Sequence, residues 1–160
     1  MIFVAVGTQK FQFNRLLITM DKLIAKGYIK DEVFAQIGFS DYIPQNYPYK
    51  TMMEKSEFDA MIDKCDLLIT HSGVGTIISG LSRSKSVIVV PRKRKYKEHI
   101  DDHQVQIAEA FAAQNLILKC EKTKNILACI KEAQHHSFDR YVSKNDVVIN
   151  EIESFLNTLK

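Results

Sequence analysis

The chain has 160 residues, of which 46% are hydrophobic and 26% are charged. This balance is typical of one soluble globular domain, and no apolar run approaches the roughly 20 residues needed to cross a bilayer. A formal net charge of +3 is too small to indicate nucleic-acid binding. Cys65, Cys120 and Cys129 form no C-x-x-C pair, which argues against a structural zinc site. The first residues carry no basic leader, so we expect a cytoplasmic protein.

The first half of the chain alternates buried strands with helices. Continuous apolar runs are typical of strands covered on both faces, and apolar residues at three- and four-residue spacing are typical of helices. The elements expected here are, in chain order, a strand at 1–6, a loop at 7–10, a helix at 13–24 that Gly27 ends, a strand at 33–38, a short strand near 49–53 and a helix capped by Ser56.

The most informative stretch is 66–77, with the sequence DLLITHSGVGTI. An apolar strand ends at His71, two glycines separated by one residue follow, and a helical pattern begins at once. Glycine lets a backbone approach a ligand closely, Ser72 and Thr76 offer hydroxyls, and the free amides of a helix start attract anions. The stretch predicts a phosphate site. A tight turn in which His71 is only a satisfied strand-end residue fits this stretch equally well when it is considered alone.

The second half of the chain continues the alternation and contains one dense basic run. The elements expected here are a helix to about Arg83, an apolar strand at 86–90 ending at Pro91, the basic run Arg92 to Lys97, a helix capped by Asp101 with Gln104 in capping-box position, a strand at 116–118, a helix capped by Thr123, and an amphipathic helix at 144–160. We expect that last helix to complete the core, with docking on a partner as the alternative.

These elements predict a single α/β domain, residues 1–160, with a doubly wound parallel sheet of Rossmann-like type. Ligands bind such sheets outside the carboxyl ends of the strands. The loops 7–10, 71–76 and 91–104 would gather at that edge, which favours nucleotide binding over a simple tight turn.

Several motifs are absent. The chain has no P-loop, no complete G-x-G-x-x-G after the first strand and no G-x-S-x-G elbow. Asp101, Asp102 and His103 are adjacent, but neighbouring carboxylates at a helix start point in different directions, and capping explains Asp101 without an ion. We therefore expect no metal and no cofactor.

With these loops assembled, the sequence resembles the glycosyltransferase family 28 C-terminal domain, the donor-binding half of GT-B glycosyltransferases. It is similar to the free-standing small subunits of split enzymes, namely exopolysaccharide proteins of the PssE type and the cytosolic subunit of the chitobiosyl-lipid N-acetylglucosaminyltransferase. The segments that carry the resemblance are IFVAVGT at 2–8, DLLITHSGVGT at 66–76, VVP at 89–91 and DHQ at 102–104.

The resemblance implies a donor site for a UDP-sugar. Gly7, Thr8 and Gln9 would line the first phosphate-facing loop, His71 would end the central strand beside it, and the diphosphate would lie on the helix start at Ser72, Gly73, Val74, Gly75 and Thr76. His103 and Gln104 would contact the hydroxyls of the sugar, and Pro91 and Arg92 would lie beside the diphosphate. No metal would be required, because helix dipoles and basic groups stabilise the leaving diphosphate in this family.

Two positions depart from the family pattern. Ser79 stands where many relatives carry an acidic residue that binds the ribose, and Asp102 stands where the closest relatives often have asparagine. A serine hydroxyl binds a ribose hydroxyl less strongly than a carboxylate does, so nucleotide affinity should be modest.

The resemblance also implies that the chain is half of an enzyme. A membrane-anchored partner subunit would bind the acceptor, and the two would transfer a hexose or N-acetylhexosamine to a lipid-diphosphate acceptor during exopolysaccharide or capsule synthesis. The catalytic residues are not identified. The protein would be recruited to the inner face of the membrane by the partner or by the basic loop Arg92 to Lys97. The alternative is a non-catalytic enhancer of a partner transferase. An epimerase of related fold is more distant, since it needs a second domain.

Overall fold

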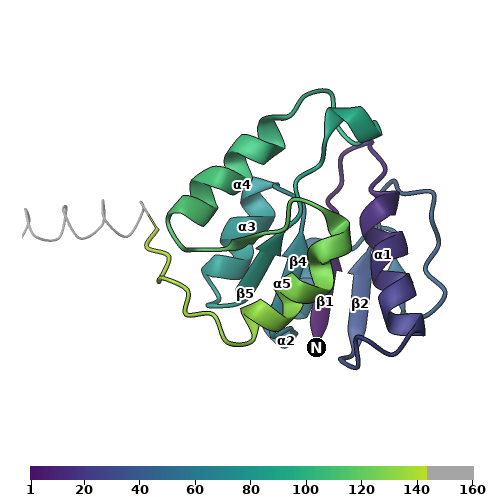
Figure 1. Cartoon of the computed structure of the whole chain (residues 1–160), viewed down its shortest axis with the longest axis horizontal. Helices are drawn as coiled ribbons and strands as arrows, with labels where there is room; N and C mark the ends of the chain where they lie inside the picture. Colours follow the sequence, from purple (N-terminus) through teal and green to yellow (C-terminus); the bar gives the residue numbers. More distant parts are fainter. Residues whose placement is uncertain (144–160) are drawn as a thin grey trace, which may run out of the picture.

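The computed structural model describes residues 1–143 (Figure 1). The helix predicted at 144–160 lies outside the described residues. Six parallel strands form one sheet in the order β3-β2-β1-β4-β5-β6, which is the doubly wound arrangement that the sequence predicts. The strands are β1 (Ile2–Ala5), β2 (Val33–Gln36), β3 (Tyr49–Lys50), β4 (Leu67–Thr70), β5 (Ser86–Val89) and β6 (Leu118–Lys119).

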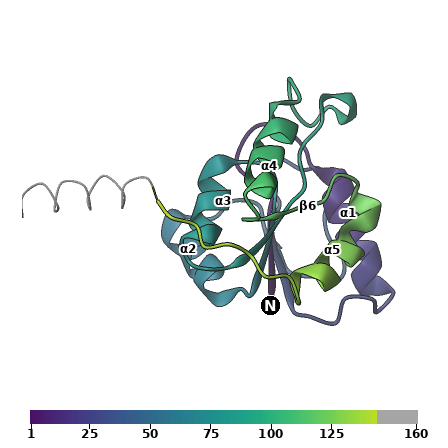
Figure 2. The ribbon, with the colours of Figure 1, turned by 60° about the vertical axis from the view of Figure 1, so that its left-hand side comes forward.

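Helices cover both faces of the sheet, which is why the central strands are apolar without alternation. The helices are α1 (Asn14–Ala25), α2 (Lys55–Lys64), α3 (Val74–Leu81), α4 (His103–Ala113) and α5 (Ile126–Ala133), with short 3₁₀ turns η1 (Arg94–Tyr96) and η2 (Thr123–Asn125). One core cluster joins Val4 of β1 to α1 and α5, and the other joins Phe3 of β1 to α2, α3 and α4. Figure 2 shows α2 and α3 on one side of the sheet and α1 and α5 on the other.

The register brings the carboxyl ends of the inner strands level with one another. Ala5 at the end of β1 pairs with Gln36 of β2 on one side and with Thr70 of β4 on the other. Thr70 in turn pairs with Val89 at the end of β5. The loops that follow β1, β4 and β5 therefore start side by side, as the sequence predicts.

Several predicted element starts differ from the structure by one or two residues. Helix α2 begins at Lys55, because the carbonyl of Glu54 already accepts the amide of Phe58 at 2.9 Å, so Ser56 lies inside the first turn and caps nothing. Strand β6 begins at Leu118, which pairs with Ile88. The preceding apolar pair, Leu116 and Ile117, is buried against the α2–α3–α4 side of the sheet instead.

The helix expected after Thr123 begins with a 3₁₀ turn. Thr123 is the first residue of η2, and α5 follows from Ile126 with Asn125 as its N-cap residue. Among the described residues, no helix combines the length and apolar character needed to span a membrane.

Candidate functional site

A cavity of about 250 Å³ opens at the carboxyl edge of the sheet, where the loops after β1 and β4 meet. Five of the residues that line it are predicted site residues, and two more come from the end of β2 and from α2. The lining residues are Gly7, Thr8, Gln9, Gln36, Phe58, His71 and Thr76. The structure therefore brings the first loop, the strand-end histidine and the start of α3 together around one space.

His71 is packed between the two loops, with 7% of its surface exposed. A β-carbon added at Gly7 would lie 2.5 Å from Cε1 of His71, and one added at Gly73 would lie 2.3 Å from Nε2. Gly7 also has φ +83, a left-handed conformation that glycine adopts without strain. Both glycines are therefore needed to make room for the imidazole, a requirement that pattern analysis did not predict.

The hydrogen bonds of Thr70 define the tautomer of His71. The hydroxyl of Thr70 donates to the carbonyl oxygen of Ala5 at 2.7 Å, so it has no second hydrogen for the Nδ1 of His71, which lies 3.2 Å away. The Nδ1–H group must therefore donate to Thr70, which leaves Nε2 with a lone pair. Burial, and after it the charge of Arg92, lowers the pKa of His71 to about 4, so the imidazole is neutral at physiological pH.

The start of α3 presents unpaired backbone donors. The carbonyl of Gly73 accepts the amide of Ile77 at 3.0 Å, whereas the N–H groups of 74–76 have no partner within residues 1–143. The Oγ of Ser72 is also buried without a partner in that part of the chain. An added β-carbon at Gly75 would meet nothing within 4 Å. The arrangement suits an anion, since amides and the positive end of the helix dipole point the same way.

Gln104 has a different role from the predicted capping box. Helix α4 begins one residue later than expected, at His103, and the Asp101 carboxylate accepts the His103 amide at 3.0 Å. Gln104 is turned inward with 5% of its surface exposed. Its Oε1 accepts the amide of Ser72 at 3.3 Å and that of Arg92 at 3.1 Å. Gln104 thus ties the loop after β4 to the loop after β5.

The two residues predicted to contact the sugar, His103 and Gln104, differ in burial. The carbonyl oxygen of Gln104 is used by backbone amides, so its Nε2 is the group left to act as a donor. His103 is exposed, and its Nδ1 lies 2.9 Å from Oε1 of Gln106 on the next turn of α4.

Arg92, which begins the basic run and is predicted to lie beside the diphosphate, is fully buried. Its side chain is 0% exposed, and its guanidinium donates to the carbonyl oxygens of Val6, of Phe11 at 3.1 Å and of Glu98 at 3.3 Å. Pro91 is buried as well. Because the guanidinium bonds only backbone within residues 1–143, Arg92 supports the site from inside the protein and does not present its hydrogens to a ligand.

Glu98 is a supporting residue that the sequence analysis missed. Its carboxylate, 1% exposed, accepts Arg15 Nε at 2.6 Å and Arg15 Nη2 at 3.0 Å, together with the Lys93 amide at 3.0 Å. No local pattern marks it, because Arg15 lies 83 residues away in the sequence. Gln36, which lines the cavity, could have been predicted as a site residue, because it is the polar residue at the end of an apolar strand.

Ser79, predicted to face the ribose, has its hydroxyl oxygen bonded by Nη1 of Arg83 at 2.8 Å. Arg83 also forms ion pairs with Asp59 at 3.1 Å and Asp63 at 2.8 Å. The Ser79 hydroxyl keeps its own hydrogen for another acceptor.

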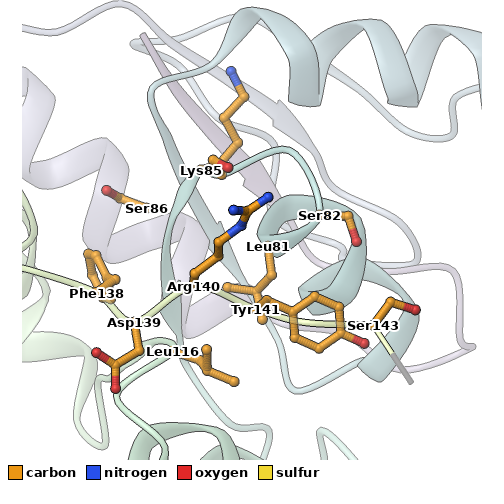
Figure 3. Close-up of a pocket in the computed structure, with 11 residues that line it drawn as sticks. Leu81, Ser82, Lys85, Ser86, Leu116, Phe138, Asp139, Arg140, Tyr141 and Ser143 are labelled. Atoms are coloured by element: carbon orange, nitrogen blue, oxygen red, sulfur yellow. The ribbon is translucent and has the colours of Figure 1, made fainter. Parts of the chain in front are cut away.

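A second cavity, of about 380 Å³, lies at the opposite edge of the sheet, near Ser86 at the start of β5 (Figure 3). Figure 3 shows Tyr141 beside Leu81, and Arg140 extending into the same region. None of the predicted site residues lines this cavity. In the described part of the chain, no three His, Cys, Asp or Glu side chains are grouped so that they could hold a metal ion.

The sheet order and the glycine-rich turn from β4 into α3 define a Rossmann-like α/β domain with its ligand edge at the carboxyl ends of the strands. Residues 1–159 match the model of the glycosyltransferase family 28 C-terminal domain, and the chain belongs to this family.

Two curated relatives are subunits of a transferase. The chain is 24% identical over 142 residues to the human UDP-N-acetylglucosamine transferase subunit ALG13, covering 83% of this chain and 12% of that protein. It is 32% identical over 91 residues to the Candida albicans protein of the same name, covering 57% of this chain and 25% of that protein. The chain therefore matches only a small part of either relative.

Two solved structures illustrate the similarity of fold. The glycotransferase of kitacinnamycin has a TM-score of 0.61 at 18% identity, over 84% of this chain and 34% of that chain. The solution structure of ALG13 has a TM-score of 0.59 at 20% identity, over 89% of both chains. At these identities the likeness establishes the fold, which is that of one half of a GT-B glycosyltransferase.

Proposed function

We propose that this protein is the donor-binding subunit of a two-component glycosyltransferase and that its donor is a UDP-sugar. Membership of the family and the names of the two ALG13 relatives support this proposal. The observation that carries it is the cavity at the carboxyl edge, which Thr76 in the first turn of α3 lines together with the loop of Gly7, Thr8 and Gln9. UDP-N-acetylglucosamine is the first donor to test, because both relatives are named for it.

In this proposal each part of the edge has a chemical task. The diphosphate lies on the N–H groups of residues 74–76, with the buried hydroxyl of Ser72 as a further donor. The neutral His71 fills the floor of the site without adding charge. The Nε2 group of Gln104 and the exposed His103, both on α4, would contact sugar hydroxyls.

The same elements would favour the transfer step. As the bond between the sugar and UDP breaks, negative charge develops on the leaving diphosphate. Preorganised amides at a helix start stabilise that charge. We propose that no metal takes part. A partner subunit would supply the acceptor site and the catalytic base, and the acceptor would be a lipid-linked diphosphate of exopolysaccharide or capsule synthesis.

An enhancer function is the second candidate, and Ser79 favours it. A carboxylate at this place would bind a ribose firmly, whereas the Ser79 hydroxyl is already bonded by Arg83, which is itself held by Asp59 and Asp63. Under this alternative the chain would activate a partner transferase without holding its donor.

We also propose a place for the protein at the inner face of the cell membrane, reached through the partner or the basic loop. Arg94, Lys95 and Lys97 are exposed, and the loop carries exposed apolar surface at Tyr96 (46%) and Ile100 (71%). Cations next to exposed aromatic and aliphatic side chains suit an anionic lipid surface.

Calorimetric titration of the full chain with UDP, UDP-glucose, UDP-galactose and UDP-N-acetylglucosamine, alone and with its membrane partner, tests the proposed function. Saturable binding with one sugar preferred supports a donor subunit. Absence of binding in both states, together with activation of the partner, would leave the enhancer as the better explanation. Gly75→Asp provides the control for binding at the α3 site, because its β-carbon lies in open space.

A further inference from the structure

Arg92 is an unusual side chain, because it is a cation with no exposed surface and no bonded carboxylate among residues 1–143. Its three acceptors are the backbone carbonyls of Val6, Phe11 and Glu98, which are neutral. Its Nε is buried and has no partner in the same residues, and the guanidinium carbon lies 5.3 Å from the centre of the Phe13 ring. Burying a charge in this way costs free energy, which favours a functional reason for keeping the charge here.

The carboxylate of Glu98 attracts Arg92 electrostatically but does not bond its guanidinium. The carboxylate oxygens of Glu98 are occupied by the guanidinium of Arg15 and by the backbone amide of Lys93. The group of Arg15, Arg92 and Glu98 thus carries two positive charges and one negative charge. Burial lowers the pKa of Arg92 to about 10, which leaves the guanidinium protonated at physiological pH.

This charge lies directly behind the proposed donor site. Nη2 of Arg92 bonds the carbonyl of Val6, and the next residue, Gly7, lines the 250 Å³ cavity. The backbone amide of Arg92 shares Oε1 of Gln104 with the amide of Ser72, at the turn into α3. The charge of Arg92 also contributes to the lowered pKa of His71, which lines the same cavity.

We propose that Arg92 is a fixed buried cation that attracts the diphosphate of the donor from behind Gly7 and His71 without touching it. This inference rests on the proposed function, because it assumes that a nucleoside diphosphate occupies the cavity. The protein around Arg92 has a low dielectric constant, so its field at the cavity is weakened less than that of a surface lysine. His71, which lines the same cavity, is neutral and adds no charge of its own.

The test compares ligands of increasing negative charge in variants that remove either a positive or a negative charge from this group. Uridine, UMP and UDP are titrated into the wild type, Arg92→Met, Arg92→Lys and Glu98→Gln. Arg92→Met should weaken UDP about tenfold, UMP less and uridine within about twofold, and Arg92→Lys should restore most of the loss. Glu98→Gln should tighten UDP, because it raises the charge of the group from +1 to +2. Lys97→Met, which removes an exposed cation from the same loop, should change UDP affinity by less than about twofold.

A merely structural role for Arg92 predicts other results. Equal losses for all three ligands in Arg92→Met, or weaker UDP binding in Glu98→Gln, would overturn the proposal. If Arg92→Met does not fold, the sign of the Glu98→Gln effect and the Lys variant decide the question. Titration with inorganic pyrophosphate distinguishes failure of the donor function from failure of the proposed role of Arg92. Pyrophosphate binding that depends on Arg92, without UDP binding, would refute the donor function and keep the role of Arg92, whereas a wild type that binds neither would refute both.

Discussion

The imidazole of His71 occupies the space that a side chain on Gly73 would need. A β-carbon at Gly73 would lie 2.3 Å from Nε2 of His71, although φ −73 and ψ 112 at this residue are accessible to any amino acid. The glycine is therefore required by a neighbouring side chain and not by backbone conformation. Gly75, two residues later, has no such neighbour.

Gly73→Ala and Gly75→Ala should therefore differ in stability, although both add one methyl group. We expect Gly73→Ala to lower the free energy of unfolding by about 1–3 kcal/mol, because the methyl group displaces His71. Gly75→Ala should be neutral or stabilising by up to about 1 kcal/mol, since alanine favours a helix. Urea unfolding measures both. In a His71→Ala background the loss from Gly73→Ala should shrink, and an unchanged loss would show that His71 is not its cause.

Gly75→Asp should abolish UDP binding while the fold persists. The new side chain enters open space, so it should not disturb packing, but its carboxylate would repel the diphosphate proposed to lie on the amides of 74–76. Gly75→Asn is the matched control with the same shape and no charge, and it should retain most of the affinity. Calorimetry on both variants makes the comparison. If the Asp variant binds UDP as the wild type does, the diphosphate lies elsewhere.

The fold was predictable because its signals are local and strong. The runs that became β1, β4 and β5 are apolar except for Thr70 at the end of β4 and Ser86 at the start of β5, and the turn 71–76 follows directly on the central strand. The errors fall where a residue type suits two structural roles. Ser56 has the right side chain for a cap but lies inside α2, and Leu116 and Ile117 are apolar enough for a strand but pack beside the sheet.

The support of the candidate site was less predictable, because it depends on contacts between distant parts of the chain. Arg92 looks like any other member of a basic run until it is seen to bond Val6, 86 residues away. Gln104 fits a capping box by spacing, yet its partners are Ser72 and Arg92. Sequence pattern places residues on elements, whereas the burial of a polar side chain depends on which loops the fold brings next to it.

Gln104→Met should destabilise the protein more than an ordinary substitution of a polar residue. Methionine has nearly the same length but no acceptor, so the buried amides of Ser72 and Arg92 would both lose their partner. We expect a loss on the order of 2 kcal/mol in urea unfolding. Gln104→Glu keeps an oxygen at the same place and should be the milder change. The tie between the two loops would be disproved by a Met variant as stable as the wild type.

Stability should fall with acidification because His71 stays neutral in the folded protein. Its pKa is lowered to about 4 from 6.5, so below pH 6.5 the unfolded chain takes up a proton that the folded chain refuses. The contribution of neutral His71 is complete above pH 6.5 and is lost as the pH falls from 6.5 to 4. By the free energy per pKa unit, the loss between pH 7 and pH 5 is about 2 kcal/mol.

The matched variant for this pH dependence is His71→Gln, which keeps a polar side chain that does not titrate. Urea unfolding at pH 7 and pH 5 gives the free energy of each protein, and subtracting the variant removes the contributions of all other titrating groups. The wild type should lose about 2 kcal/mol more than the variant. Equal losses would mean that His71 titrates as it does in the unfolded chain.

The exposed part of the basic loop should bind anionic vesicles. Arg94, Lys95 and Lys97 each contribute about 1 kcal/mol near a negative lipid surface, so reversing all three to Glu should weaken the binding by at least about a hundredfold. Sedimentation with phosphatidylserine-containing vesicles, at low and high salt, measures this. Reversal of Lys22, Lys26 and Lys30, which belong to α1 and the turn after it, makes the same change in net charge on another surface and should have little effect. Equal effects of the two triple variants would indicate attraction by net charge, and loss of membrane binding only when the partner subunit is absent would assign recruitment to the partner.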